Sequence, residues 1–188
     1  IVTGGVAPAP SGVGMEGGAV LNDASQLPHH RVVTDAVHRE GGKIALQILH
    51  TGRYSYQPNL VAPSAIQAPI NRFTPHALSH DEILTLIDDF ARCAALAREA
   101  GYDGVEVMGS EGYLINEFLA ARTNQRDDEW GGDYARRMRF AVEVVRAVRE
   151  RAGADFIIIY RLSMLDLVEG GGTFDETVQL AQAIEAAG

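Results

Sequence analysis

Apolar runs of strand length alternate along the chain with longer stretches in which apolar residues recur at helical spacing. The order of apolar run, polar loop and amphipathic helix repeats along the whole sequence. The strands predicted from the runs are Ile1–Thr3, Lys43–His50, Asp103–Met108 and Phe156–Leu162. The predicted helices are His30–Glu40, Ile83–Ala100, Tyr134–Arg151 and a last one that begins after Thr173 and runs to Gly188. The last of the four apolar runs is apolar enough to be buried on both faces of a sheet.

Capping boxes mark the start of two of these helices. Ser79 with Glu82, and Thr173 with Glu176, have the spacing in which each side chain accepts a hydrogen bond from the backbone N–H of the other residue. Gly101 ends the helix that the first box begins. These signals define the helix boundaries more sharply than the apolar pattern does.

Strands that alternate with helices predict right-handed βαβ crossovers and a parallel sheet. Such a sheet is either open and doubly wound or part of a (β/α)8 barrel. The first predicted strand lacks the G-x-G-x-x-G pattern of dinucleotide-binding sheets, which weakens the first alternative. Four βα units in 188 residues amount to about half of a barrel of roughly 250 residues. We therefore predict an α/β fold, a partial (β/α)8 TIM barrel.

The ends of the chain fall inside predicted elements. Ile1 lies within an apolar run, and Gly188 stands where a helix would end and the next strand begin. No linker divides the chain. We expect residues 1–188 to be a single segment of a barrel domain that is truncated at both ends.

Composition narrows the class of protein. The formal net charge is −9, with no basic stripe, which argues against a nucleic-acid partner. Cys93 is the only cysteine, so the residues hold no internal disulfide and no cysteine-ligated metal cluster, and its helical setting predicts a buried structural thiol. No apolar stretch approaches the roughly 20 residues of a membrane span, and no signal peptide is visible. We expect a cytoplasmic enzyme with no membrane partner.

Polar side chains gather in the connection Val107–Gly132, just past the C-terminal end of a predicted buried strand. Parallel α/β enzymes place their sites at that end of the sheet. Tyr113 is the candidate acid there, since Gly112 permits close backbone approach and Glu111 can orient or tune the phenol. Packing is nevertheless the commoner role of a tyrosine.

Four polar residues stand at or near the ends of predicted strands. Gln47 lies inside an apolar strand and needs a hydrogen-bond partner, which is either neighbouring backbone or a ligand. Arg161 ends its strand and needs an anionic or electron-rich partner, either a ligand or a carboxylate such as Asp166 or Glu106. His50 and Arg53 begin a second long loop, 51–78, and are equally consistent with a site and with loop architecture. The glycines between residues 4 and 18 could cradle a phosphate or simply make that loop flexible.

Four segments together carry a family resemblance: LQILHTGRYSYQP, VEVMGSEGYLINEFL, RTNQRDDEWGG and IIIYRLS. With them the chain resembles the old yellow enzyme family of flavin-dependent TIM barrels over essentially its whole length. Within that family it looks like the branch of bacterial NADPH-dependent 2,4-dienoyl-CoA reductases. Other branches tend to carry histidine-containing variants of the GYL loop, where this chain has Met108 and Glu111.

The resemblance implies a role for each matching residue. Gly5, Gln47 and Arg161 would contact FMN, with Arg161 beside the N1/O2 edge of the ring. Tyr113 would donate the proton to the dienoyl chain, and Glu111 would belong to the same site. The acyl-CoA substrate would be contacted by the segment Arg122, Thr123, Asn124 and Gln125. Trp130, Gly131, Gly132 and Arg137 look like structural anchors for the next helix.

The resemblance also implies parts that these residues do not contain. A histidine from a later barrel strand would support the tyrosine, and none of the six histidines of this chain has a matching context. A 4Fe-4S cluster and a domain that binds FAD and NADPH would follow the barrel. The partners of this segment would then be the acyl-CoA substrate, the rest of the barrel and that downstream domain.

Three functions remain open from the sequence. The first is reduction of 2,4-dienoyl-CoA in unsaturated fatty-acid β-oxidation. The second is another flavin reaction of the same barrel family, such as enone reduction or amine demethylation, against which the Glu111 substitution argues. The third is a half-barrel without catalysis that serves as a binding or assembly module, against which the crowded polar loop argues.

Overall fold

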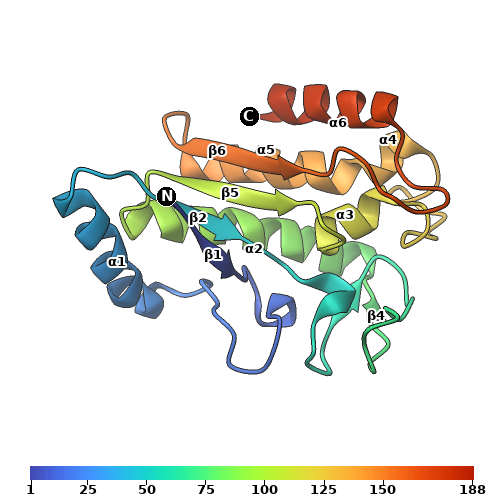
Figure 1. The fold of residues 1–188 in the computed structure, drawn as a ribbon, viewed down its shortest axis with the longest axis horizontal. Coiled ribbons are helices and arrows are strands. Elements are labelled where there is room, and N and C mark those ends of the chain that lie inside the picture. The colour runs from blue at the N-terminus through green and yellow to red at the C-terminus, as the bar shows by residue number, and fades with distance from the viewer.

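The computed structural model describes all residues, 1–188, and contains one parallel sheet in the order β1-β2-β5-β6 (Figure 1). These strands are β1 Val2–Val6, β2 Ala45–Ile48, β5 Gly104–Gly109 and β6 Ile157–Leu162. Each strand of the sheet lies beside the one that precedes it in the chain. The order of the strands across the sheet therefore never reverses, as in the arc of a barrel and unlike a doubly wound sheet.

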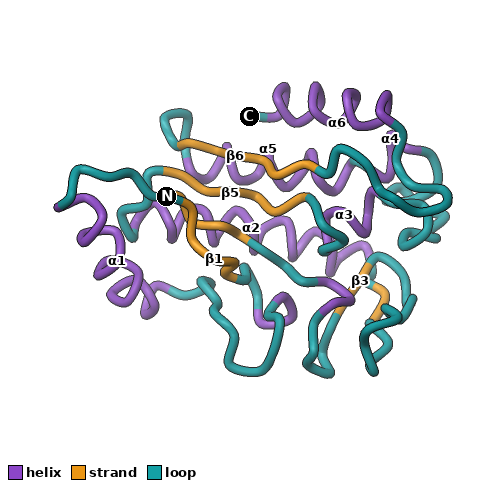
Figure 2. Tube along the Cα trace, viewed as in Figure 1, coloured by secondary structure: helices purple, strands orange, loops and turns teal.

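Helices connect and cover these strands (Figure 2). They are α1 Leu27–Arg39, α2 His80–Glu99, α3 Leu114–Leu119, α4 Tyr134–Arg137, α5 Arg139–Ala152 and α6 Phe174–Ala187. The loops add three 3-10 turns, η1 Pro10–Gly12, η2 Ala24–Gln26 and η3 Gly52–Tyr54, and a short parallel pair, β3 Val61–Ala62 with β4 His76–Ala77. The long loop predicted at 51–78 thus has some structure of its own.

The hydrophobic core lies between the sheet and the helices α2 and α5, which run behind it in Figure 1. Alternate residues of the central strand, Val105 and Val107, point into this core. Behind them Phe118 stacks on Phe140 with ring centroids 4.3 Å apart, and Phe90 meets Phe140 edge-on. Because strand side chains alternate between faces, the opposite face of the sheet carries the remaining residues and is not covered by these helices.

The structure confirms the alternation of strands and helices and corrects several details. The strand predicted at 156–162 was expected to be buried on both faces, and this was wrong. Ile157 and Ile159 are 53% and 38% exposed, because they point to the face of the sheet that the helices leave open. The helix predicted at 134–151 is interrupted at Met138, which separates α4 from α5 but keeps right-handed backbone angles.

Boundaries also shift at two strands and agree at the helix caps. The strand predicted at 1–3 extends to Val6, and the one predicted at 43–50 shortens to Ala45–Ile48. Both capping boxes form as predicted, with Ser79 and Thr173 as the capping residues. Cys93 is fully buried, as expected of a structural thiol, and burial raises its pKa. None of the helices has the length and apolar character needed to cross a membrane.

Asp103, just before β5, ties the N-terminal end of the sheet to α1. Its carboxylate accepts hydrogen bonds from Lys43 Nζ at 2.8 Å, His38 Nε2 at 2.9 Å and the backbone N–H of Ile44 at 2.9 Å. Burial alone would raise the pKa of Asp103, but these hydrogen bonds outweigh burial and hold the pKa well below its usual range. Stability from this group is therefore present above the ordinary aspartate pKa and is lost as the pH falls through the folded-state value.

We expect Asp103→Asn to lower the free energy of unfolding by about 2 kcal/mol at neutral pH, since hydrogen bonds to a charged group contribute roughly that much. The difference from the parent protein should shrink as the pH falls below about 4. Urea unfolding between neutral and acid pH measures both effects. The control is Asp155→Asn, which also precedes a strand but is exposed and makes no hydrogen bond. A loss of unfolding free energy in Asp103→Asn that does not depend on pH would contradict this account.

Candidate active site

A polar cluster crosses three strands on the open face of the sheet. Gln47 of β2, Glu106 of β5 and Arg161 of β6 lie on neighbouring strands. Glu106 Oε1 accepts hydrogen bonds from Gln47 Nε2 at 2.7 Å and from Arg161 Nε at 3.2 Å, and its Oε2 accepts one from Arg161 Nη2 at 3.1 Å. The pattern of apolar residues hid this arrangement, because the partners are more than fifty residues apart in sequence.

Arg161 therefore has the carboxylate partner that the sequence left open, and the partner is Glu106 and not Asp166. The guanidinium is still 45% exposed, whereas the Glu106 side chain is only 6% exposed. Hydrogen bonds and charge from Glu106, and more weakly the charge of Glu111, raise the pKa of Arg161. The guanidinium of Arg161 thus keeps N–H donors exposed on the open face of the sheet, while the carboxylate of Glu106 compensates its charge.

Gly5 of β1 borders this cluster. A Cβ added at Gly5 would lie 2.9 Å from Leu49 Cβ and 3.2 Å from Gln47 Oε1, so any other residue here would have to displace Leu49. At Gly4 an added Cβ would meet nothing within 4 Å, so the backbone here faces open space. The structure brings together all three residues predicted to contact a cofactor.

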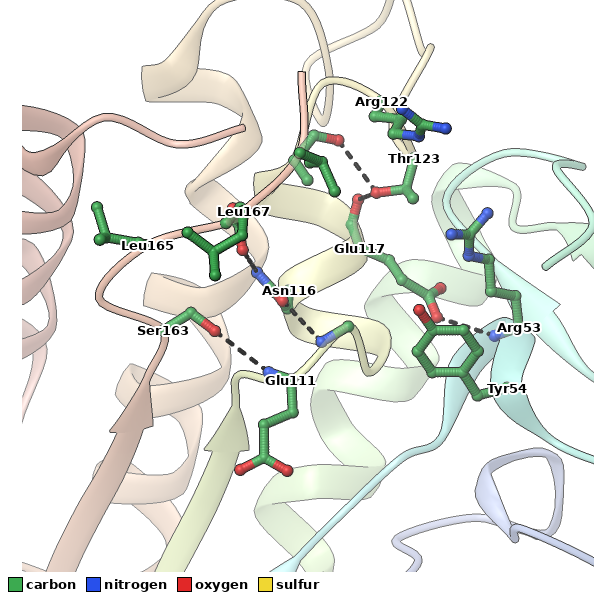
Figure 3. Close-up of a pocket in the computed structure, with 14 residues that line it drawn as sticks. Arg53, Tyr54, Glu111, Asn116, Glu117, Arg122, Thr123, Ser163, Leu165 and Leu167 are labelled. Carbon is green, nitrogen blue, oxygen red and sulfur yellow. Dashed lines mark hydrogen bonds between the residues drawn. The ribbon is translucent and has the colours of Figure 1, made fainter. Parts of the chain in front are cut away.

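A cavity of about 280 Å³ opens beside the C-terminal ends of β5 and β6 (Figure 3). The loops that follow β2, β5 and β6 line it, together with α3. Its lining residues are Arg53, Tyr54, Glu111, Gly112, Asn116, Glu117, Ala120, Arg122, Thr123, Ser163, Leu165, Asp166, Leu167 and Val168. Several polar residues of the loop 107–132, among them Glu111, Asn116, Glu117 and Arg122, therefore surround one space.

Glu111 occupies a strained position at the edge of the cavity. It is the only residue other than glycine with a positive φ, 63°. Its N–H donates to Ser163 Oγ at 3.2 Å, and the next N–H, of Gly112, donates to Asn116 Oδ1 at 2.7 Å. Figure 3 shows its carboxylate pointing away from Asn116. Such strain persists only where surrounding contacts enforce it, and it concentrates at functional sites.

Tyr113 caps α3 and does not itself line the cavity. Its ring meets the ring of Tyr54, which does, edge-on with centroids 6.2 Å apart. The Tyr113 hydroxyl makes no hydrogen bond within the chain and is therefore free to act on a ligand. Its catalytic role stays a prediction.

The four residues predicted to contact substrate occupy different environments. Arg122 is exposed and lines the cavity, and Thr123 lines it while being buried. Gln125 is exposed but outside the cavity lining. Asn124 is only 3% exposed, and its amide donates to the backbone carbonyls of Phe118 at 2.8 Å and Trp130 at 2.7 Å. The geometry gives Asn124 a role in holding the loop and leaves Arg122 best placed to meet a ligand.

We expect Asn124→Ala to lower the free energy of unfolding by about 2–3 kcal/mol, because it leaves two buried carbonyls without donors. Gln125→Ala removes the exposed side chain of the neighbouring residue and should change the free energy of unfolding by less than about 0.5 kcal/mol. Thermal or urea unfolding of the two variants provides the comparison. An Asn124→Ala protein of unchanged stability but weakened substrate binding would instead assign this amide to the substrate.

His50 and Arg53 are explained largely by loop architecture. His50 Nδ1 accepts from the Gly52 N–H at 3.1 Å, its Nε2 lies 3.2 Å from Ser11 Oγ, and burial lowers its pKa to about 3. The backbone N–H of Arg53 donates to Glu117 Oε1 at 2.9 Å, while its side chain reaches the cavity. Glu117 is 1% exposed, and burial raises its pKa well above the usual value.

The structural anchors are confirmed. Trp130 is 1% exposed, and its Nε1 donates to His80 Nδ1 at 3.1 Å. Arg137 Nε donates to the Leu119 carbonyl at 2.8 Å, and its Nη1 donates to the Gly132 carbonyl at 2.5 Å. These contacts fix the end of the loop 107–132 against the following helix.

Comparison with known proteins identifies the family of this chain. All residues, 1–188, match the NADH:flavin oxidoreductase / NADH oxidase family. The N,N-dimethylglycine/sarcosine dehydrogenase of Chromohalobacter salexigens is 40% identical over 167 residues, which cover 86% of this chain and 24% of that protein. The chain thus spans about a quarter of the length of this relative.

Two solved structures show the same fold. A 2-naphthoyl-CoA reductase, in complex with 2-naphthoyl-CoA, superposes with a TM-score of 0.92 at 34% identity, over 99% of this chain and 31% of that one. Morphinone reductase, in complex with tetrahydroNAD, gives a TM-score of 0.84 at 35% identity, over 96% of this chain and 55% of that one. The predicted partial TIM barrel is confirmed.

The fold and these matches define the class as a flavin-dependent oxidoreductase barrel, of which residues 1–188 form a part. The chain belongs to the NADH:flavin oxidoreductase / NADH oxidase family, whose old yellow enzyme-like members include morphinone reductase.

The donor set on the open face of the sheet fits FMN, the flavin of this family. Gln47 Oε1 has no donor within the chain, and Arg161 Nη1 has no acceptor. An unpaired acceptor and an unpaired cationic donor beside bare glycine backbone complement the edge of a flat ring that carries both carbonyl and N–H groups. Glu106 is the member of this set that sequence analysis missed as a site residue, although a carboxylate inside the apolar run DGVEVM was an available signal.

Proposed function

We propose that the full-length protein is an FMN-dependent reductase of conjugated CoA thioesters. Its proposed substrate is 2,4-dienoyl-CoA, which it reduces with electrons from NADPH in unsaturated fatty-acid β-oxidation. The observation that carries the proposal is the cavity at the ends of β5 and β6, where Arg53 and Arg122 lie beside the Glu111 turn. Guanidinium groups suit the phosphates of CoA. The likeness to a 2-naphthoyl-CoA reductase supports the same substrate class.

The residues of this chain have separate tasks in that reaction. Gly5, Gln47 and Arg161 would hold FMN, which in its reduced form would supply the hydride for the conjugated carbon chain. Tyr113, whose hydroxyl has no partner within the chain, would donate a proton to the carbon chain as negative charge develops on the thioester. Glu111 positions the turn that precedes this tyrosine.

Arg122 binds the CoA part of the substrate at the rim of the cavity, with Thr123 beside it. In this proposal the remaining half of the barrel completes the flavin site. An FAD- and NADPH-binding domain and a 4Fe-4S cluster would deliver the electrons of NADPH to the FMN. Cys93 is buried in α2 and takes no part in such a cluster.

A second candidate is oxidation of a methylated amine, or reduction of an enone. It is favoured by the 40% identity to an N,N-dimethylglycine/sarcosine dehydrogenase and by the likeness to morphinone reductase. Glu111 argues against it, because the resemblance to those branches predicts a histidine-containing turn. The two candidates share the flavin site and differ in what occupies the cavity.

Anaerobic stopped-flow measurements on the full-length flavoprotein separate the candidates. We expect 2,4-hexadienoyl-CoA to reoxidise the reduced flavin at least about tenfold faster than 2-cyclohexenone at equal concentration. Reduction of the oxidised flavin by dimethylglycine, or faster reoxidation by the enone, would replace the proposal with the second candidate. A purified protein without bound flavin would point to a binding module instead.

A further inference from the structure

Glu106 is a carboxylate in the middle of the central strand β5, and its side chain is only 6% exposed. Taking a carboxylate out of water costs several kcal/mol unless its charge is paired and its oxygens are hydrogen-bonded. An apolar residue would be less costly to bury at this point of the sheet. The position therefore calls for an explanation beyond stability.

Both carboxylate oxygens of Glu106 are occupied by residues of the two neighbouring strands. Oε1 accepts from Gln47 of β2 at 2.7 Å and from Arg161 of β6 at 3.2 Å, and Oε2 accepts from Arg161 at 3.1 Å. The strands β2, β5 and β6 lie side by side in the sheet (Figure 1), so Glu106 stands between its two partners.

These contacts determine which atoms Gln47 and Arg161 present to a ligand. A carboxylate can only accept, so the amide of Gln47 must turn its NH2 group toward Glu106 and its Oε1 away from it. Gln47 Oε1 then lies on the side of Gly5, where an added Cβ would be 3.2 Å from it. Arg161 uses Nε and Nη2 on Glu106, which leaves Nη1 unpaired.

We propose that Glu106 is a positioning residue of the flavin site. It sets the amide orientation of Gln47, holds the guanidinium plane of Arg161, and offsets part of the positive charge that Arg161 presents to the flavin. The inference rests on the proposed function, because FMN is the group that these two side chains would contact. Glu106 itself does not need to touch the flavin.

The test is Glu106→Gln in the full-length flavoprotein. A glutamine has one acceptor oxygen and one donor group, so it cannot satisfy Gln47 and both Arg161 nitrogens together. We expect the dissociation constant of oxidised FMN to rise about tenfold, the loss of roughly one charge-assisted hydrogen bond. We also expect the flavin reduction potential to become more positive, since an uncompensated guanidinium favours the anionic reduced ring.

Matched variants separate positioning from a general loss of charge or fold. Glu143→Gln removes an equal charge that pairs with Arg146 at 2.6 Å on α5, and it should leave both values unchanged. In a Gln47→Ala background, Glu106→Gln should weaken FMN binding less than it does in the parent protein, because one of the two side chains that Glu106 positions is already absent. If Glu106→Gln does not fold, Glu106→Asp keeps the charge but draws the carboxylate back from Gln47 and Arg161, and it should also raise the FMN dissociation constant.

The outcomes distinguish the inference from the function on which it rests. A parent protein that binds no FMN overturns the proposed function. A parent protein that binds FMN, with Glu106→Gln unchanged in affinity and in potential, overturns the positioning role alone. A folded Glu106→Asp variant with unchanged affinity would do the same.

Discussion

Replacing Tyr113 by phenylalanine is expected to lower turnover of the dienoyl thioester by about 10²–10⁴-fold, the usual contribution of a positioned general acid. FMN should remain bound, and its reduction by NADPH should continue at the parent rate, because that half-reaction does not need the proton. The hydroxyl makes no hydrogen bond within the chain, so its removal should leave the surrounding structure intact. Stopped-flow absorbance of the flavin resolves the two half-reactions.

Tyr56→Phe is the matched control for this experiment. Tyr56 is 57% exposed and its hydroxyl also makes no hydrogen bond, so the same atom is removed away from the cavity. Its turnover should equal that of the parent protein. Joint loss of FMN and activity in Tyr113→Phe would count against the proton-donor role and would assign this tyrosine to the architecture of the site.

Gly52→Ala is expected to lower the free energy of unfolding by about 3 kcal/mol or more. Gly52 has φ 58°, which costs an alanine roughly 1 kcal/mol by itself. An added Cβ would also overlap the carboxyl group of Glu117, which is 1% exposed. A buried side chain has no room to retreat, so overpacking adds to the backbone strain.

Gly17→Ala isolates the backbone contribution, because Gly17 has φ 77° and an added Cβ there meets nothing within 4 Å. It should lower the free energy of unfolding by only about 1 kcal/mol. Chemical unfolding of both variants measures the difference, which reports the contact with Glu117. Equal penalties in the two variants would show that Glu117 moves aside freely and does not brace the loop after β2.

The order of strands and helices was predictable because it depends on local signals. Runs such as 103–108 have the length and apolarity of strands, and the capping boxes at Ser79 and Thr173 mark helix starts through contacts three residues apart. Burial of β6 was predicted wrongly from the same kind of signal. Apolarity along a strand does not reveal which face the helices cover, and Ile157 and Ile159 lie on the open one.

The candidate site divides in the same way. Gln47 and Arg161 stood out because each is a polar residue in an apolar strand, whereas Glu106 was considered only as a possible partner. Its importance depends on the register of three strands, which joins residues more than fifty positions apart. Asn124 was predicted to contact substrate, which stays a prediction, and the sequence did not reveal that its amide spans two backbone carbonyls.

The sequence by itself determined the alternating elements, the polar loop 107–132 and the family resemblance, because each depends on residues that are close together in the chain. Only the tertiary structure decided which polar groups are already satisfied and which remain free for a ligand. Hydrogen-bond satisfaction is a property of neighbours in space, and in a parallel sheet those neighbours come from distant parts of the chain. Asn124 is thereby occupied, Glu106 becomes the centre of the sheet-face cluster, and the Tyr113 hydroxyl is left without a partner.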